Sequence, residues 1–310
     1  MSDYREIKEI IEQYDSICIY RHIHADYDAY GSQLGLKALI NDNYPEKKVY
    51  ALGTDDLDNP YLLEPLDEAD EETVKKSLAV IVDTSNLARV ELDSWKLCAD
   101  SVRLDHHPFV EQICNHEIID TDASSCAQIV TELAIDAGWH ISTKAADYLY
   151  AGISTDTLKM TIEKVDARCF RVVAVLAEAG INFDSLNRRI YDNDIRMYKA
   201  ETAARNKIVF DGNFAYLLLT AKDLEEMDLE EEEARDMVNI MQNIRGVDKY
   251  ATVIEDKNGL EFNISLRSHG IVINTIAMKY GGGGHPSASG IGHLKPELVP
   301  DVLKDMKEKE

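Results

Sequence analysis

Residues 21–36, RHIHADYDAYGSQLGL, decide the fold, because they join a short strand to a helix through a dense cluster of polar side chains. The run 16–22 is rich in β-forming residues, and the apolar spacing of 31–42 is typical of a helix. Four ionisable side chains lie at the junction: His22, His24, Asp26 and Asp28. A strand that leads directly into a helix is the unit of an α/β fold, in which ligands bind outside the carboxyl ends of the strands.

Further strand-like runs follow along the chain, and then a mainly helical region and a second β-rich block. Further β-rich runs occur at three places: 47–53, 77–84 and 101–107. The region from about 123 to 205 is mainly helical, and a second β-rich block follows at 213–220 and 249–268. Within that block Asn258-Gly259 separates two strand-like runs, which predicts a hairpin.

This organisation predicts a two-domain protein of the α/β class. We expect an N-terminal domain over 1–181, with a mainly parallel sheet and helices on both of its faces. A helical linker is expected over 182–211, and a smaller C-terminal α/β domain over 212–310.

The composition excludes several classes of protein. The 310 residues carry a net charge of -24, which disfavours binding along a long nucleic acid, because such binding needs clustered Lys and Arg. No apolar run of about 18 residues is present, so we expect no membrane contact and a cytoplasmic location. The five cysteines are widely spaced, which indicates buried free thiols.

Carboxylates and imidazoles follow the predicted strands. The candidates at strand ends are His22, Asp26, Asp28, Asp83, Asp105, His106 and His107, and Asp156 follows a further apolar stretch. Held together, so many carboxylates would repel one another unless a cation neutralised them. Mixed histidine nitrogens and aspartate oxygens suit Mn²⁺, with Fe²⁺, Co²⁺ and Mg²⁺ as alternatives.

Each candidate also has a simpler interpretation. An aspartate after a strand is commonly a helix cap or a turn former. A pair such as His106-His107 is often one buried and one surface residue. These interpretations would have to hold independently at four places that the fold brings to one edge of the sheet.

Five motifs together resemble those of the DHH phosphoesterase superfamily. In chain order they are HIHADYDAYGS (22–32), VDTSN (82–86), DHHP (105–108), GISTDT (152–157) and GGGGHPSASG (281–290), the last being similar to the glycine-rich motif of the DHHA1 substrate domain. Motif order, chain length and the SLRS segment at 265–268 make the sequence most similar to the bacterial nano-RNase and pAp phosphatase group.

The resemblance implies a site with two divalent metal ions, Mn²⁺ being the preferred ion. One ion would be held by His22, Asp26 and Asp83, and the other by Asp28, Asp83, His106 and Asp156. Asp83 would therefore bridge the ions, beside a bridging hydroxide. The resemblance also implies that His107 contacts phosphate or transfers a proton, and that Asp105 orients its neighbours.

Substrate recognition is expected mainly in the C-terminal domain. The expected substrate-binding residues are Arg267, Ser268, Gly282, Gly283, Gly284 and His285, with Arg89 as a further candidate. Glycines permit close backbone approach to a phosphate, and an arginine can hold phosphate with two hydrogen bonds.

The implied function is hydrolysis of very short oligonucleotides to nucleoside 5′-monophosphates, together with dephosphorylation of pAp. Alternatives are a cyclic-di-AMP or pApA phosphodiesterase, a pyrophosphatase or polyphosphatase, and a nucleotide-binding regulator without turnover. The expected partners are short oligonucleotides or small phosphorylated nucleotides, and homodimerisation is left open. The sequence departs from the family pattern at Cys126, Gln128, Leu158 and Met160, which bears on the shape of the pocket.

Overall fold

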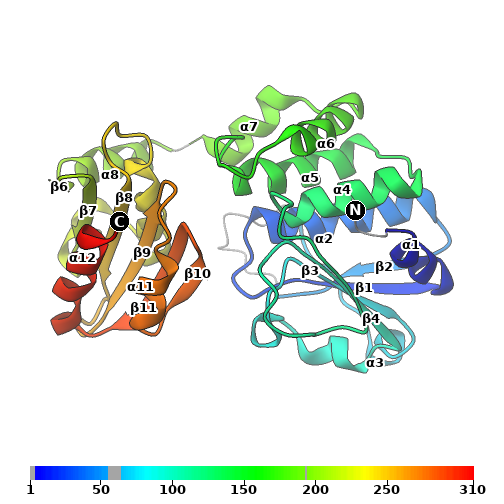
Figure 1. The fold of residues 1–310 in the computed structure, drawn as a ribbon. Coiled ribbons are helices and arrows are strands. Elements are labelled where there is room, and N and C mark those ends of the chain that lie inside the picture. Colours follow the sequence, from blue (N-terminus) through cyan, green and yellow to red (C-terminus); the bar gives the residue numbers. More distant parts are fainter. Residues whose placement is uncertain (1–3, 55–63, 193) are drawn as a thin grey trace. The chain divides into compact units, whose positions relative to one another are not determined.

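The computed structural model describes residues 4–54, 64–192 and 194–310, and the chain divides into two compact units, residues 1–191 and 192–310 (Figure 1). Each unit contains one β-sheet with helices packed against it. The predicted α/β class, with a parallel sheet followed by a second sheet, is therefore confirmed. Among the described residues, no helix is both long and apolar enough to cross a membrane.

The first unit contains a five-stranded parallel sheet with the strand order β2-β1-β3-β4-β5. Its strands are β1 (Ser16–Tyr20), β2 (Lys48–Ala51), β3 (Leu78–Val82), β4 (Asp100–Asp105) and β5 (His116–Ile119). The chain passes from β1 to β2 on one side and then returns across β1 to β3. The strand order thus reverses between β1 and β3, and such a switch point is where open α/β sheets bind ligands.

Helices cover the two faces of this sheet unequally. One face carries the long helices, and the other carries a short helix and two 3₁₀ turns. The long helices are α1 (Tyr4–Gln13), α2 (Tyr27–Asn43), α4 (Cys126–Ala137), α5 (Thr143–Asp156), α6 (Ala167–Glu178) and α7 (Phe183–Tyr191). The short elements are α3 (Glu71–Val74), η1 (Leu87–Arg89) and η2 (Asp93–Leu97).

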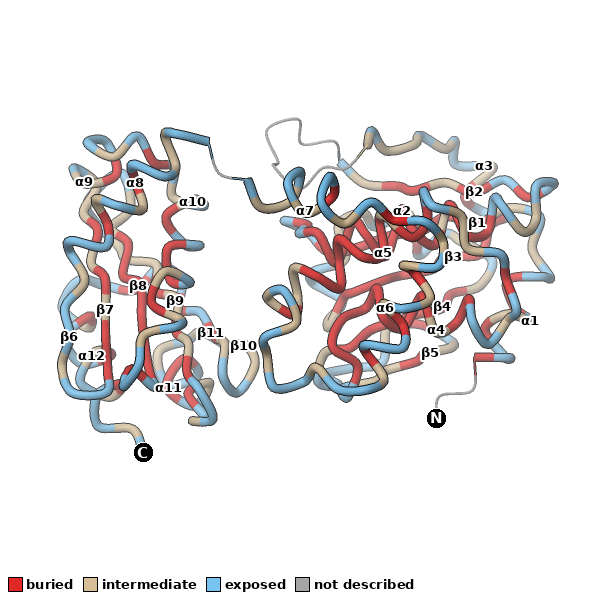
Figure 2. The backbone as a smooth tube through the Cα atoms, turned by 90° about the horizontal axis from the view of Figure 1, so that it is seen from above, coloured by how far each residue is buried: buried red, intermediate tan, exposed pale blue. Residues whose placement is uncertain are grey.

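The core explains why the central strands lack an alternating polar pattern. All five residues of β3 are buried, because Val80 and Val82 face the long helices while Ala79 and Ile81 face the other side. Buried segments run through the sheet and along the inner sides of the helices (Figure 2). A strand that is covered on both faces reads as a continuous apolar run.

The helix predicted over 31–42 begins earlier than expected, at Tyr27. The Asp26 carboxylate accepts hydrogen bonds from the backbone N–H groups of Asp28 and Ala29, both at 3.0 Å, and so caps the helix. The cap places Asp28 inside the first turn, where its side chain is buried.

The second unit contains a mixed six-stranded sheet with the order β10-β11-β9-β8-β7-β6. Its strands are β6 (Val209–Asp211), β7 (Phe214–Leu219), β8 (Lys249–Glu255), β9 (Phe262–Ser268), β10 (Gly283–His285) and β11 (Ala288–Leu294). Strands β7 and β8 are parallel, and the other pairs are antiparallel. The hairpin predicted at Asn258-Gly259 is confirmed as the connection between β8 and β9.

Helices leave part of one face of the second sheet open. Helices α11 (Asn274–Lys279) and α12 (Val299–Glu308) cover one face, where Ile264, Leu266 and Ile291 are buried. On the opposite face lie α8 (Ile195–Arg205), α9 (Ala221–Met227), α10 (Glu231–Asp236) and the 3₁₀ helix η3 (Met237–Met241). Their hydrophobic cluster includes described residues of β7 and β8 but none of β9 or β11. A short 3₁₀ helix η4 (Pro296–Leu298) precedes α12.

Helices α2 and α5 approach each other closely at two glycines. A Cβ atom on Gly31 would lie 2.5 Å from the backbone oxygen of Tyr148. A Cβ atom on Gly152 would lie 2.7 Å from the Asp28 carboxylate. Backbone cannot move away as a flexible side chain can, so Gly31 fixes the distance between the two helices.

We predict that Gly31→Ala destabilises the first unit, although alanine is the better helix former by ~1 kcal/mol. The added methyl group would force α2 and α5 apart and lower the free energy of unfolding by ~1–3 kcal/mol. Denaturant unfolding measures the effect, with Asp42→Ala on the exposed side of α2 as the control. Unchanged or increased stability in Gly31→Ala would contradict the close approach of the two helices.

Candidate metal centre

The ends of three parallel strands and two helices bring the ionisable candidates of the first unit together. His22 lies two residues after β1, Asp83 lies directly after β3, and Asp105 ends β4. Asp28 comes from the first turn of α2, and Asp156 is the last residue of α5. His106 and His107 continue the chain beyond β4. All of the residues proposed as metal ligands lie near the switch point of the sheet.

Asp83 occupies the middle of this cluster. Its Oδ2 atom lies 3.3 Å from Nε2 of His22, and its Oδ1 atom lies 3.4 Å from Nε2 of His106. The residue is 2% exposed, and Oδ1 accepts no hydrogen bond in the described part of the chain. Its φ angle of 49° is left-handed, which is uncommon for a residue with a side chain. The carboxylate therefore presents its two oxygens to two separate groups of side chains.

The first group consists of His22, Asp26 and Asp83, whose ligand atoms lie within 4.8 Å of one another. Nδ1 of His22 lies 2.7 Å from the carbonyl oxygen of Ile23. A proton on Nδ1 that is donated to this carbonyl leaves the Nε2 lone pair facing Asp83, and this tautomer suits a metal ligand. Asp26 is half exposed and also caps α2, so the simpler interpretation of this aspartate as a helix cap is confirmed as well.

The second group consists of Asp28, His106 and Asp156. Nε2 of His106 lies 3.9 Å from Oδ2 of Asp28 and 3.4 Å from Oδ2 of Asp156. The Asp28 carboxylate is fixed from behind, because it accepts hydrogen bonds from the backbone N–H groups of Cys126 (2.7 Å) and Ala127 (2.9 Å) at the start of α4. The partial positive charge of a helix N-terminus favours this carboxylate.

Burial and neighbouring carboxylates shift the pKa values of the residues in the cluster. Burial, followed by the charges of Asp83 and Asp156, raises the pKa of Asp28 well above its usual value. Burial also raises the pKa of Asp156 to about 7, against the opposing effect of His106. Burial alone would lower the pKa of His106, but the carboxylates of Asp83, Asp156 and Asp28 outweigh it and raise that pKa to about 10. Such a cluster fits divalent cations, because a cation relieves the repulsion between the carboxylates.

His107 lies beside this cluster and is oriented by Asp105. Its Nδ1 atom lies 2.8 Å from Oδ1 of Asp105 and 3.5 Å from Oδ1 of Asp83. Asp105 is buried and also accepts a weaker hydrogen bond from the backbone N–H of His107. The imidazole is thereby held at the edge of the candidate metal centre.

The other candidates are divided between the two units. Arg89 lies beside the cluster, with Nη2 3.2 Å from Nδ1 of His22. Arg267, Ser268, the glycine run and His285 belong to the second unit. In the sheet register Arg267 of β9 and His285 of β10 both pair with Ala288 of β11, so they share the open face. The Ser268 hydroxyl instead donates to the backbone oxygen of Ile271, on the face of the sheet that packs against helices.

The glycine run contains glycines with different roles. A Cβ atom on Gly282 would lie 2.1 Å from the backbone oxygen of Gly290, and Gly284 has a φ angle of 133°. These two glycines are required by the sheet itself. Gly283 has neither restriction, and a Cβ atom there would meet no described atom within 4 Å, so its open side leaves room for a ligand.

Sequence reasoning missed several residues that support the cluster. Arg21 is buried, pairs with Glu91 at 2.6 Å and donates to the backbone oxygen of His22 at 3.2 Å. Gly152 makes room for the Asp28 carboxylate. The glycine of the motif GISTDT could have indicated a close approach at Gly152. No local pattern connects Arg21 to Glu91, which follows 70 residues later.

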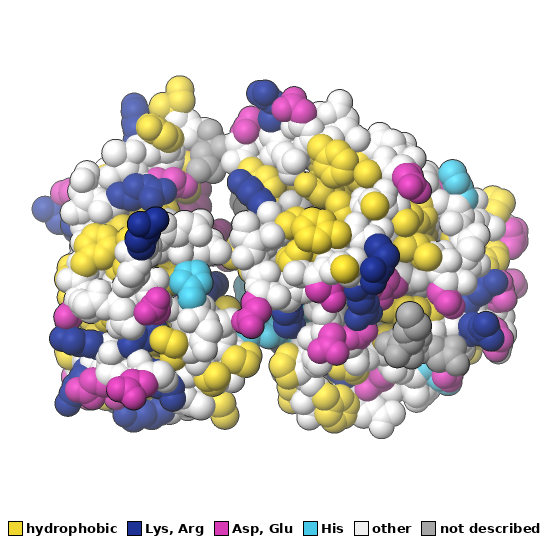
Figure 3. All heavy atoms as spheres, turned by 45° about the horizontal axis from the view of Figure 1, so that its top comes forward, with side chains coloured by type: hydrophobic (Ala, Val, Ile, Leu, Met, Phe, Trp, Pro, Cys, Tyr) yellow, Lys and Arg dark blue, Asp and Glu magenta, His cyan; other side chains and the backbone are white. Residues whose placement is uncertain are grey.

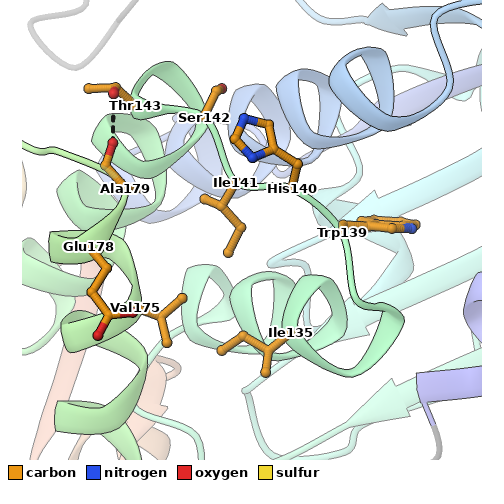
Figure 4. A pocket seen from close by; sticks show the side chains of 9 residues that line it. All are labelled: Ile135, Trp139, His140, Ile141, Ser142, Thr143, Val175, Glu178 and Ala179. Carbon is orange, nitrogen blue, oxygen red and sulfur yellow. Dashed lines mark hydrogen bonds between the residues drawn. The ribbon is translucent and has the colours of Figure 1, made fainter.

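A separate hollow of about 690 Å³ opens at the other ends of α4 and α5 (Figure 4). Its lining residues are Ile135, Trp139, His140, Ile141, Ser142, Thr143, Val175, Glu178 and Ala179. The length of α5 separates this hollow from Asp156 by roughly 20 Å. None of its nine lining residues is a candidate ligand, and the Thr143 hydroxyl already donates to the backbone oxygen of Ala179. The candidate ligands of the first unit therefore lie at the strand ends and not in this hollow.

The comparisons with known proteins agree with this arrangement. Residues 16–153 match the DHH family, N-terminal domain, and residues 211–309 match the DHHA1 domain. The chain is 31% identical over 305 residues to the bifunctional oligoribonuclease and PAP phosphatase NrnA of Bacillus subtilis (strain 168), with 97% of this chain and 96% of the relative covered. It is 30% identical over 308 residues to the probable bifunctional oligoribonuclease and PAP phosphatase NrnA of Streptococcus mutans, with 99% of both chains covered.

A solved structure shares the fold. The crystal structure of an exopolyphosphatase-related protein from Bacteroides fragilis matches with a TM-score of 0.86 at 24% identity, and the match covers 98% of this chain and 95% of that chain. Fold and relatives together define a hydrolase that acts on phosphate esters. The chain belongs to the DHH family and carries a DHHA1 domain, so the resemblance of its motifs is confirmed. Members of this family depend on metal ions, and the histidine and aspartate groups described above could bind them.

We predict that Gly152→Ala weakens metal binding. The added methyl group would push against the Asp28 carboxylate and shift its oxygens away from His106. Changes in the surroundings of a metal ligand typically cost about 10- to 100-fold in affinity. Calorimetric titration of the metal-free protein with Mn²⁺ measures the effect.

Gly35→Ala is the matched control. It adds a methyl group to the same helix pair, but the group would meet only the flexible side chain of Leu149. Equal affinities in Gly152→Ala and the wild-type protein would show that Asp28 does not take part in metal binding.

Proposed function

We propose that the chain is a Mn²⁺-dependent phosphoesterase that hydrolyses very short oligonucleotides to nucleoside 5′-monophosphates and also dephosphorylates pAp. The observation that carries the proposal is the placement of Asp83, whose two carboxylate oxygens face two groups of candidate ligands. Two relatives that match almost the whole chain carry both activities in their names, which supports this choice of substrates.

Two divalent ions are proposed at the centre. The first would be held by His22, Asp26 and Asp83, and the second by Asp28, Asp83, His106 and Asp156. The four carboxylates match the total charge of two divalent ions. Mn²⁺ accepts both nitrogen and oxygen ligands, and Fe²⁺, Co²⁺ and Mg²⁺ are the alternatives.

Bound ions would supply Lewis-acid polarisation of the phosphate and promote deprotonation of the attacking water. The residues of the chain provide the positioning. Asp105 accepts from Nδ1 of His107, which directs Nε2 of the imidazole toward the substrate phosphate or toward a proton. The N-terminus of α4 holds the Asp28 carboxylate in a single orientation.

Catalysis is assigned to the first unit and substrate recognition mainly to the second. Arg267 and His285 lie on the open face of β9, β11 and β10, and Gly283 leaves the backbone beside them accessible. A guanidinium and a glycine-lined backbone are suited to holding a phosphate group. Arg89 could add a positive charge next to the first group of ligands.

The preference for short substrates follows from the charge of the chain. On the face drawn in Figure 3, the Lys and Arg side chains of the described residues are scattered among Asp and Glu side chains and form no continuous track. The chain has a net charge of -24, so substrate phosphates that lie beyond the binding residues make no favourable contact with it. We also propose a cytoplasmic location, which the free cysteines of the described residues support, because thiols stay reduced there.

We predict that Asp83→Asn abolishes turnover of pAp and pApA in the presence of Mn²⁺. An amide cannot balance the charge of two ions, so the rate should fall by more than about 100-fold, the upper loss for residues that merely support a ligand. Steady-state rates on a panel of pAp, pApA, di- to pentanucleotides, a 25-mer, cyclic-di-AMP and pyrophosphate measure this loss and also rank the alternative substrates.

Asp42→Asn is the control, since it removes the same charge from the exposed surface of α2. Wild-type rates in Asp83→Asn would reject the two-ion assignment. A protein that binds nucleotides but turns over no member of the panel would instead be the regulator considered as an alternative.

We predict that Arg267→Ala lowers kcat/KM for pApA without changing Mn²⁺ binding. Loss of one charge-assisted contact of ~1.5–3 kcal/mol corresponds to roughly 10- to 150-fold. Bis-p-nitrophenyl phosphate lacks a second phosphate, so its hydrolysis should be nearly unaffected. Arg245→Ala, at an exposed position of the same unit, controls for the change in net charge. Equal losses on both substrates would contradict a recognition role for Arg267.

A further inference from the structure

Exposed apolar side chains lie on the same loops as several candidate metal ligands. Four of them, here named the apolar rim, lie on the loops that follow β1, β3 and β4: Ile23 (36% exposed), Leu87 (41%), Phe109 (62%) and Val110 (62%). Ile23 follows His22 directly, and Phe109 lies two residues after His107. Contiguous exposed apolar surface often marks an interaction site.

Hydrogen bonds between these loops show that they lie side by side. The backbone N–H of Ile23 donates to the backbone oxygen of Arg89 at 2.8 Å. The backbone N–H of Leu87 donates to Oε1 of Glu111 at 2.9 Å. The loop after β3 is thus joined to the loops after β1 and β4, so the residues of the apolar rim lie on three adjacent loops.

Phe109 and His107 cover neighbouring positions on one face of β4. Side chains alternate along a strand, so Arg103 and Asp105 point to the same side. The ring of Phe109 lies with its centroid 6.0 Å from the Arg103 guanidinium, while Nδ1 of His107 lies 2.8 Å from Asp105. Positions two apart on a strand are separated by ~7 Å. Phe109 and His107 therefore lie beside two side chains that leave the same face of β4 two residues apart.

The support under Phe109 is rigid. Arg103 is fully buried, lies 3.3 Å from Oε1 of Glu117 through its Nε atom, and donates to the backbone oxygen of Ser85 at 3.4 Å. The phenyl ring lies 6.0 Å from this buried cation, and the residue is nevertheless 62% exposed. A second flat group can therefore stack on the ring without any rearrangement of the protein.

We propose that Phe109, flanked by Leu87 and Val110, stacks against the nucleobase of the nucleotide whose phosphate occupies the metal centre. This inference rests on the proposed function. A nucleobase fits because it is flat and uncharged, so the strongly acidic chain does not repel it. Stacking also tolerates every base, since each base has a π-face. The rim thus selects base-bearing phosphate esters over base-free esters, without selecting a base sequence.

The test compares Phe109→Ala, Phe109→Trp and the control Phe210→Ala, which removes an equally exposed phenylalanine from the second unit (56% exposed). Rates are measured for pApA and for the corresponding dinucleotide without bases. Binding of 2-aminopurine riboside 5′-monophosphate, a product analogue that is not turned over, is followed by fluorescence in the presence of Mg²⁺.

Phe109→Ala should lower kcat/KM for pApA by roughly 5- to 150-fold, which corresponds to the ~1–3 kcal/mol of one stacked base. The base-free substrate should be unaffected, Phe109→Trp should restore activity, and the fluorescence quenching on binding should disappear only in Phe109→Ala.

Equal losses of kcat/KM on both substrates or unchanged quenching in Phe109→Ala would overturn the inference. A molecular mass in solution that differs between Phe109→Ala and the wild-type protein would also overturn it, because the rim would then be an interface with a second copy. If the wild-type protein turns over no nucleotide, the proposed function fails, and the quenching measurement still decides whether Phe109 stacks a base.

Discussion

Repulsion between buried carboxylates at the switch point of the parallel sheet is the constraint on which the first unit depends. Asp28, Asp83 and Asp156 converge there, and burial together with neighbouring carboxylates raises the pKa values of Asp28 and Asp156. The chain stabilises this arrangement with backbone N–H groups at the start of α4 and with histidines. Glycines bring α2 and α5 close enough for their carboxylates to share one site. Protonation of Asp28 and Asp156 relieves the repulsion at lower pH, and a bound cation would relieve it while the carboxylates stay ionised.

The fold and the convergence of the candidate residues could be predicted from the sequence, because both depend on local patterns. Apolar runs located the strands, and polar residues after each run located the candidates, since the carboxyl ends of parallel strands meet at one edge. The contact between Asp28 and Cys126 could not be predicted, because it joins positions 98 residues apart. The pairing of Arg21 with Glu91 could not be predicted for the same reason. The role of Gly152 also depends on how two helices pack, which no local pattern records.

The two faces of the sheet in the second unit are covered unequally, and the proposed recognition residues Arg267 and His285 lie on the less covered face. Helices α11 and α12 cover one face, whereas the hydrophobic cluster on the other face contains described residues of β7 and β8 but none of β9, β11 or β10. Sequence reasoning chose Arg267 and His285 on that open face, whereas it could not see that Ser268 points to the opposite face. Successive residues of a strand face opposite sides of the sheet. The side that a given residue faces can therefore be predicted only when the strand's boundaries are known.

Electron paramagnetic resonance of the Mn²⁺-loaded protein tests the central claim most directly, because it reports whether two ions share a ligand. If Asp83 bridges two sites, Mn²⁺ should bind in pairs and give the spectrum of an exchange-coupled pair, which Asp83→Asn should convert to that of isolated ions. A spectrum of isolated ions in the fully loaded wild-type protein would contradict a shared carboxylate at the centre.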